Sequence, residues 1–251
     1  MPPQWYHILW IGAVVGLSSG LFGIGGALLS TPLLRIFLAL PPLLALGTPI
    51  PVAVPSAVAG AVAYSRKKLV HWRVARTTLL VGIPANVFGA YATEWVSGKL
   101  LMILTAVFLF GTGAMFFIRG WILRGRVEQE PNVTTFNVLV TGMVAGFLSG
   151  FLAIGGGIVM VPAFVRLLRL PLKQALATSL LCVAGFAIPS TVTHFLLQHI
   201  DPVVAGLLAA IVIPFGYWGA RIAIRLRNQV LERIYGTTIL LFALYFLYTQ
   251  W

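Results

Sequence analysis

Two glycine clusters are the residues of this 251-residue chain best suited to hold a ligand through the backbone. One lies in the run GLFGIGGALLSTP (residues 20–32) and the other in GFLAIGGGIVMVP (residues 150–162). Consecutive glycines disfavour an uninterrupted helix, and a helix that restarts after a break presents unpaired amides and a partial positive charge. We therefore expect an anion to bind there. The residues predicted to form these breaks are Gly25, Gly26, Gly155, Gly156 and Gly157.

Hydroxyl side chains near the clusters add hydrogen-bond donors. Thr48 follows the first cluster, and Thr178 and Ser179 follow the second, while Ser19 and Ser149 precede them. No Lys or Arg is expected in the middle of a membrane span. We therefore predict that helix ends and hydroxyls, and not a fixed cation, bind the anion.

Four other glycines have a different interpretation. Gly16 and Gly20, and likewise Gly146 and Gly150, are spaced i, i+4 in apolar runs. Small residues at this spacing allow membrane helices to approach closely. We expect these four to serve helix packing.

One histidine is the best candidate for proton coupling. All five acidic residues fall in loops or at segment ends, so no carboxylate is expected in mid-membrane to relay protons or bind sodium. His194 follows Thr191 and Thr193 near the end of its apolar run, and histidine titrates in the range that a proton switch needs. The alternative is an interfacial polar residue. The other histidines, His7, His71 and His199, are interpreted as boundary residues.

The composition predicts an all-α integral membrane protein. Hydrophobic residues make up 59% of the chain and charged residues 9%, against about 25% charged in ordinary soluble domains. Several apolar runs are long enough to span a bilayer as helices. The net charge of +12 comes from Lys and Arg at segment ends, where they act as topology signals beside anionic membrane lipid. No nucleic-acid partner is expected.

The sequence contains no set of residues typical of an enzyme active site. The single Cys182 lies in an apolar run, where an inert buried thiol is expected. There are no paired carboxylates, no His/Cys spacing typical of a metal site, and no nucleophile beside a base. We predict a protein that is not an enzyme and that uses no cofactor and no metal.

An internal duplication organises the chain. A constant shift of 130 residues places Gly25 on Gly155 and also matches rarer residues further along. The other matched pairs include Pro32 with Pro162, Pro41 with Pro171, Thr48 with Thr178, and Pro84 with Pro214. The polar stretch 119–132 is then a cytoplasmic linker between a first transmembrane repeat (1–118) and a second (133–251).

The distribution of Lys and Arg predicts that the two repeats are inverted. Positive residues mark 66–76, the linker, 166–173 and 221–233 as cytoplasmic, whereas 194–201 has none. This pattern fits only if each glycine-broken segment is a hairpin that returns to its own side. Each repeat then has a hairpin plus three transmembrane helices, and both termini lie outside. Inverted repeats with interrupted helices recur in secondary transporters.

The motifs resemble one family of transporters. GLFGIGGALLSTPLL, GFLAIGGGIVMVPAFV, the segment 177–180 and IPFGYWGARIAIRL (residues 213–226), in this order, resemble the TauE/SafE family of sulfite and organosulfonate exporters. The resemblance implies a carrier in the bacterial or archaeal plasma (inner) membrane. It also implies small sulfur-containing anions such as sulfite, sulfoacetate or thiosulfate as substrates.

The first half departs from the family pattern in three places. Pro49 and Ile50 follow Thr48 where the family has Thr-Ser-Leu, and Lys68 and His71 stand where Gly and Asp precede Trp. These changes weaken the expected hydroxyl contribution of the first half. Asn86 stands beside Pro84-Ala85 in place of a Pro-Gly pair. It becomes a candidate polar ligand.

The sequence thus predicts a secondary anion transporter that works by alternating access, and the resemblance implies that it exports a small sulfur-containing anion. Two alternatives stay open, an anion channel and an uptake permease for another small anion. An intramembrane enzyme or an assembly subunit is a third class. Whether the protein forms a homodimer is also open.

Overall fold

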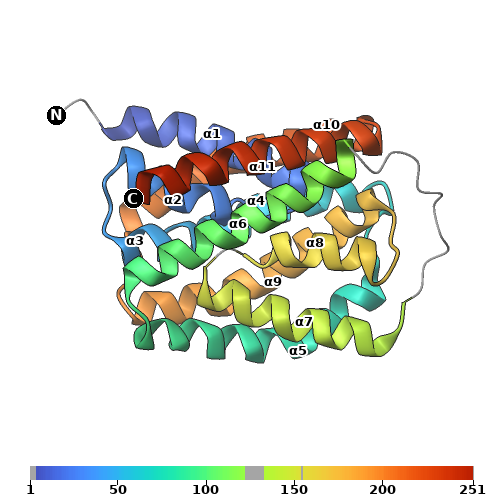
Figure 1. Ribbon diagram of the computed structural model, residues 1–251, viewed down its shortest axis with the longest axis horizontal. Helices are drawn as coiled ribbons and strands as arrows, with labels where there is room; N and C mark the ends of the chain where they lie inside the picture. The colour runs from blue at the N-terminus through green and yellow to red at the C-terminus, as the bar shows by residue number, and fades with distance from the viewer. Residues whose placement is uncertain (1–3, 122–132, 154, 251) are drawn as a thin grey trace.

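The computed structural model describes residues 4–121, 133–153 and 155–250, and it is a bundle of helices without strands in those ranges (Figure 1). The fold class predicted from composition, an all-α membrane protein, is confirmed. The first half contains α1 (Gln4–Phe22), α2 (Ala27–Phe37), α3 (Pro42–Gly47), α4 (Pro49–Ser65), α5 (Trp72–Ala92), the 3-10 turn η1 (Thr93–Trp95) and α6 (Gly98–Trp121). The second half contains α7 (Thr135–Phe151), α8 (Gly157–Arg166), α9 (Leu172–Leu196), α10 (Pro202–Arg225) and α11 (Asn228–Gln250).

Five stretches of the described helices are long and apolar enough to cross a bilayer: Trp5–Phe22, Pro42–Ser65, Gly98–Met115, Leu172–Leu196 and Pro202–Arg225. The bundle also exposes large apolar side chains on its flanks, among them Leu80 and Val203. Such a surface is stable in contact with lipid but not in contact with water. Most of the predicted linker, with Glu128 and Glu130, lies outside the described residues, and α6 continues past the predicted boundary at 118 to Trp121.

Both predicted glycine breaks are present. The first break separates α1 from α2, and the second break separates α7 from α8. Helix α8 begins at Gly157, so the third glycine of the second cluster belongs to the helix and not to the break. The helices that follow the breaks have only 11 residues (α2) and 10 residues (α8). They are too short to span the hydrocarbon core.

Equivalent positions of the two halves share unusual backbone conformations. Positive φ angles in the described residues occur in pairs separated by 130 residues. The pairs are Gly23 and Ala153, Gly25 and Gly155, Gly26 and Gly156, Ala39 and Arg169, and Lys68 and Gln198. The duplication found in the sequence therefore extends to the course of the chain at each break and at two loops per half.

The main helix pairs each join one helix of the first half to one helix of the second half. Helix α1 packs along α10, and its equivalent α7 packs along α5, which is the equivalent of α10 (Figure 1). Helix α4 packs on its own equivalent α9, and α6 on α11. The backbone of α1 at Gly12 approaches Ile211 and at Gly20 approaches Ala220, so α1 and α10 run in the same direction.

A matched pair of hydrogen bonds fixes α4 against α9. The backbone N–H of His71 donates to Thr178 Oγ1 and that of Asp201 donates to Thr48 Oγ1, each over 3.0 Å. Thr48 is the N-cap of α4 and Thr178 lies in the second turn of α9, and the partner of each threonine lies in the loop that follows the other helix. Helices α4 and α9 are therefore antiparallel.

Charged residues separate to the two ends of the bundle. At one end Lys173 Nζ donates to the carbonyl of Ile224 (2.7 Å) and Arg66 Nη1 donates to the hydroxyl of Tyr217 (3.3 Å). These contacts gather the basic loops 66–71 and 166–171 with the end of α10, and we call this region the basic end. The opposite end holds α3, η1 and the loop 197–201, and α1 begins and α11 ends there (Figure 1).

Candidate functional site

The two breaks meet in the interior of the bundle. Gly155 lies beside the carbonyl oxygen of Ile24, and Gly157 lies so close to the first break that a Cβ on it would be 2.5 Å from the carbonyl oxygen of Gly23. The five glycines predicted as ligands, Gly25, Gly26, Gly155, Gly156 and Gly157, are all buried. Segments 130 residues apart thus form one central junction.

The local chemistry of glycine explains each break. Gly26 (φ 84°) and Gly156 (φ 72°) are the N-cap residues of α2 and α8, and their left-handed backbone is strained for other L-residues. Neither supplies a side-chain acceptor to the first helical amides. Two uncapped helix N-termini, each with a partial positive charge, therefore begin at the junction.

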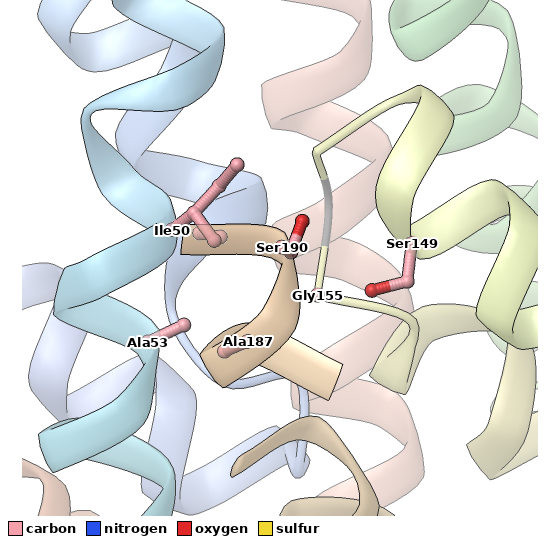
Figure 2. Close-up of a pocket in the computed structure, with 7 residues that line it drawn as sticks. Ile50, Ala53, Ser149, Gly155, Ala187 and Ser190 are labelled. Carbon is pink, nitrogen blue, oxygen red and sulfur yellow. The ribbon is translucent and has the colours of Figure 1, made fainter. Parts of the chain in front are cut away.

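A narrow pocket lies at this junction. In this conformation it is too tight for a free water molecule. Figure 2 shows Ile50 and Ala53 on one side and Ser149 on the other, with Gly155 and Ser190 between them. The lining residues are Ala27, Ile50, Ala53, Ser149, Gly155, Ala187 and Ser190, from α2, α4, α7, the second break and α9.

Buried hydroxyls without partners surround the junction. The Oγ atoms of Ser19, Ser56 and Ser190 make no hydrogen bond within the described part of the chain. Ser190 lines the pocket, and Ser19 and Ser56 lie beside Gly26. An unsatisfied buried hydroxyl costs about 1–3 kcal/mol, and an anion would accept hydrogen bonds from it.

The sequence interpretation missed Ser56 and Ser190. Each directly follows a proline inside a helix, Pro55 in α4 and Pro189 in α9. Proline removes a backbone hydrogen bond and often kinks a helix. A hydroxyl next to such a proline was the signal available in the sequence.

The predicted hydroxyls lie around the junction in structural roles. Thr48 and Thr178 accept the backbone hydrogen bonds that join α4 and α9, and they do not line the pocket. Ser179 Oγ donates to the carbonyl of Gly23 over 2.9 Å, so it contacts the first break. Pro49 occupies the equivalent position in the first half and has no hydroxyl for the second break. Substrate binding by these residues stays a prediction.

Asn86 lies behind the pocket wall, fully buried between α5, α7 and α9. With its amide turned to match the surrounding groups, it donates to the carbonyl of Phe186 (3.2 Å) and accepts from Ser149 Oγ (3.3 Å) and the amide of Gly150 (3.0 Å). This arrangement orients Ser149, which lines the pocket. Direct contact of Asn86 with a substrate stays a prediction.

His194 is buried close to the second break and has a titratable partner. Its Nδ1 lies 3.2 Å from Nδ1 of His199, and its Nε2 lies 3.1 Å from the carbonyl oxygen of Gly150. His199 Nε2 contacts Glu94 Oε1 at 3.2 Å. His199 was interpreted from the sequence as a boundary residue, but it is buried. No group of three or more His, Cys, Asp or Glu residues in the described ranges is arranged to hold a metal ion.

Comparison with known proteins identifies the family. The sulfite exporter TauE/SafE family model matches residues 8–246. The chain belongs to this family. A "Probable membrane transporter protein" of Xylella fastidiosa (strain 9a5c) is 29% identical to this TauE/SafE chain over 245 residues, covering 96% of the chain and 94% of the relative.

More distant relatives carry similar names. "Probable membrane transporter protein YunE" of Bacillus subtilis (strain 168) is 23% identical over 242 residues, 88% of this chain and 87% of its own. "Probable membrane transporter protein MJ0441" of Methanocaldococcus jannaschii is 26% identical over 178 residues, 68% of this chain and 65% of its own. No solved structure gives a significant match.

Proposed function

We propose that this TauE/SafE protein is a secondary transporter that exports a small sulfur-containing anion, such as sulfite, thiosulfate or an organosulfonate. The observation that carries the proposal is the meeting of the two breaks, at which α2 and α8 begin without caps. Each helix N-terminus contributes about half a positive charge. The site is remote from bulk water, so this field acts on an anion with little screening.

The hydroxyls of Ser56 and Ser190 complete the proposed site. Both are buried, unpartnered and close to a break. Sulfur oxyanions present several acceptor oxygens, to which backbone amides and hydroxyls can donate together. The family name agrees with a sulfur oxyanion as substrate.

We propose alternating access between two inverted halves as the mechanism. The antiparallel course of the equivalent helices α4 and α9 supports inversion, because halves of equal orientation would place them parallel. If the basic end is cytoplasmic, α2 and α8 approach the junction from opposite faces. Movement of one half against the other would then open the junction to each side in turn.

Transport by purified protein in liposomes tests the proposal. We expect saturable uptake of radiolabelled sulfite, thiosulfate or sulfoacetate, and acceleration by unlabelled anion trapped inside (counterflow). Single-channel currents would instead support a pore and overturn alternating access. Failure of all three probes to exchange would contradict the substrate class.

One substitution tests the junction as the site. Gly157→Ala adds a methyl group that collides with the carbonyl of Gly23 and pushes the breaks apart, whereas Gly206→Ala in α10 adds one in open space. Overpacking of this kind costs about 1–3 kcal/mol, and the same loss at the anion site would lower anion affinity about 5-fold to 150-fold. Equal uptake by both variants would remove the junction from the mechanism.

A further inference from the structure

Three titratable side chains form a row from the end opposite the basic end to the second break. Glu94 in η1 is half exposed, with a side-chain exposure of 48%, whereas the side chain of its partner His199 is 6% exposed. His199 contacts His194, and His194 contacts the carbonyl of Gly150. Gly150 lies in the last turn of α7, next to the pocket residue Ser149.

The number of protons in this row is the decisive feature. Three contacts join the Glu94 carboxylate, the two imidazole rings and the Gly150 carbonyl, and each requires one proton. Two neutral imidazoles bring only two protons between them. With an ionised Glu94, one contact must then place two lone pairs against each other. A third proton satisfies all three contacts.

We propose that Glu94, His199 and His194 form a proton-binding site that couples anion transport to the pH gradient. This inference rests on the proposed transport function and adds its coupling ion. In the loaded state His199 carries a proton on each nitrogen, donating from Nε2 to Glu94 and from Nδ1 to Nδ1 of His194. His194 in turn donates from Nε2 to the carbonyl of Gly150. Release removes one N–H proton from the row and leaves a net negative charge on it.

The row is connected to the proposed anion site through Gly150. Its carbonyl accepts from His194 and its amide donates to Asn86, which also accepts from Ser149. Loss of the third proton leaves one contact unmade and alters the hydrogen bonding at the end of α7. The second break follows this turn directly. Proton occupancy can therefore bias the position of the break and of Ser149.

Three further charged residues lie at this end of the bundle: Arg35 in the last turn of α2, whose guanidinium donates to the carbonyl of Leu40, Lys99 in the first turn of α6, and Asp201. Helices α3 and α7 carry no Asp, Glu, Lys, Arg or His, and the basic residues of α5 and α8 lie at the basic end. The carboxylate of Asp201 accepts from the amides of Val203 and Val204 as the N-cap of α10. Burial lowers the pKa of His199, although Glu94 raises it in part. A proton held against this burial cost is released readily, as a coupling site requires.

Transport assays in liposomes can test the proton site separately from the proposed transport function. With the membrane potential clamped, one proton moving with each anion gives about tenfold accumulation per pH unit. We use thiosulfate and sulfoacetate as probes. His199→Gln, His194→Gln and Glu94→Gln should retain counterflow of the probe, which needs no net proton movement, and lose accumulation driven by the pH gradient.

His7→Gln is the matched control, because His7 lies in α1 at the same end of the bundle and contacts Trp10 instead of the row. It should accumulate anion as the unmodified protein does. Accumulation at the unmodified level in His199→Gln and Glu94→Gln would overturn the inference. Absence of counterflow in the unmodified protein would count against the proposed function and not against the proton site.

A second measurement tests the proton site without transport. The chain has only four histidines, so side-chain nitrogen NMR of the purified protein can follow each one through a pH titration. Shared protonation predicts that His194 and His199 titrate together and that Glu94→Gln shifts both. Independent titration of the two rings, unaffected by Glu94→Gln, would overturn the inference.

Discussion

At the scale of single residues, Thr48 and Thr178 show how one residue type can fit two roles. Both follow a glycine break in the sequence, which suggests a ligand role, yet each hydroxyl accepts a backbone N–H from the other half. Both are fully buried. Their equivalence under the 130-residue shift makes them a matched pair, because each variant is an internal control for the other.

Thr48→Val and Thr178→Val should destabilise the protein by similar amounts. Valine keeps the shape of threonine but leaves the amide of Asp201 or His71 without its acceptor, at a cost of about 1–3 kcal/mol. Thermal unfolding of the detergent-solubilised variants measures this cost. Unchanged stability together with lost anion uptake would show instead that the hydroxyls serve the substrate.

At the scale of helices, glycines set how closely α1 approaches α10 and α7 approaches α5. A Cβ on Gly20 would collide with backbone atoms of Gly216 and Ala220, and one on Gly150 would collide with the backbone of Asn86. The packing role predicted for the i, i+4 glycines is confirmed. These four glycines act between helices, whereas the glycines at the breaks shape the backbone.

Gly20→Ala and Gly150→Ala should each separate a helix pair and lower the unfolding temperature, since overpacking costs about 1–3 kcal/mol. Gly111→Ala in α6 is the control, because its Cβ meets no atom within 4 Å. That variant should be neutral or gain roughly 0.5–1 kcal/mol from helix propensity. Equal unfolding temperatures for Gly20→Ala and Gly111→Ala would contradict close packing by these glycines.

The sequence could predict the elements better than the contacts between them. Glycine clusters, prolines and the constant shift have local or periodic signals, so the breaks and the two halves were accessible. The contacts of Ser179 with Gly23 and of His199 with Glu94 depend on which helix faces meet. Long-range packing decides which helix faces meet. A helix that is hydrophobic on all sides has no polar face in its sequence to indicate which side packs against a neighbour.

At the scale of the whole molecule, burial of His199 predicts how stability depends on pH. Its folded-state pKa is lowered by burial, so below its ordinary value of about 6.5 the unfolded chain binds the proton more readily than the folded one. The unfolding temperature should therefore fall as the pH drops from neutral through this value. His199→Gln should flatten the curve in detergent, while His7→Gln should leave it unchanged. A curve of unchanged slope in His199→Gln would assign the effect to other groups.

The orientation of the two halves in the membrane can be decided with one matched pair of loop positions. Lys68 and Gln198 are separated by 130 residues, both are exposed, and both have a left-handed backbone (φ 56° and 58°). In a protein freed of its buried cysteine by Cys182→Ala, Lys68→Cys and Gln198→Cys therefore introduce thiols in equivalent surroundings. Inverted halves place the two on opposite faces of the membrane, and halves of equal orientation place them on the same face.

Because the basic loop 66–71 is expected to be cytoplasmic, a membrane-impermeant maleimide added to intact cells should label the cysteine at 198 and leave the one at 68 unlabelled until the membrane is opened. Labelling of both from outside would overturn inversion and, with it, the approach of α2 and α8 from opposite faces on which alternating access is argued.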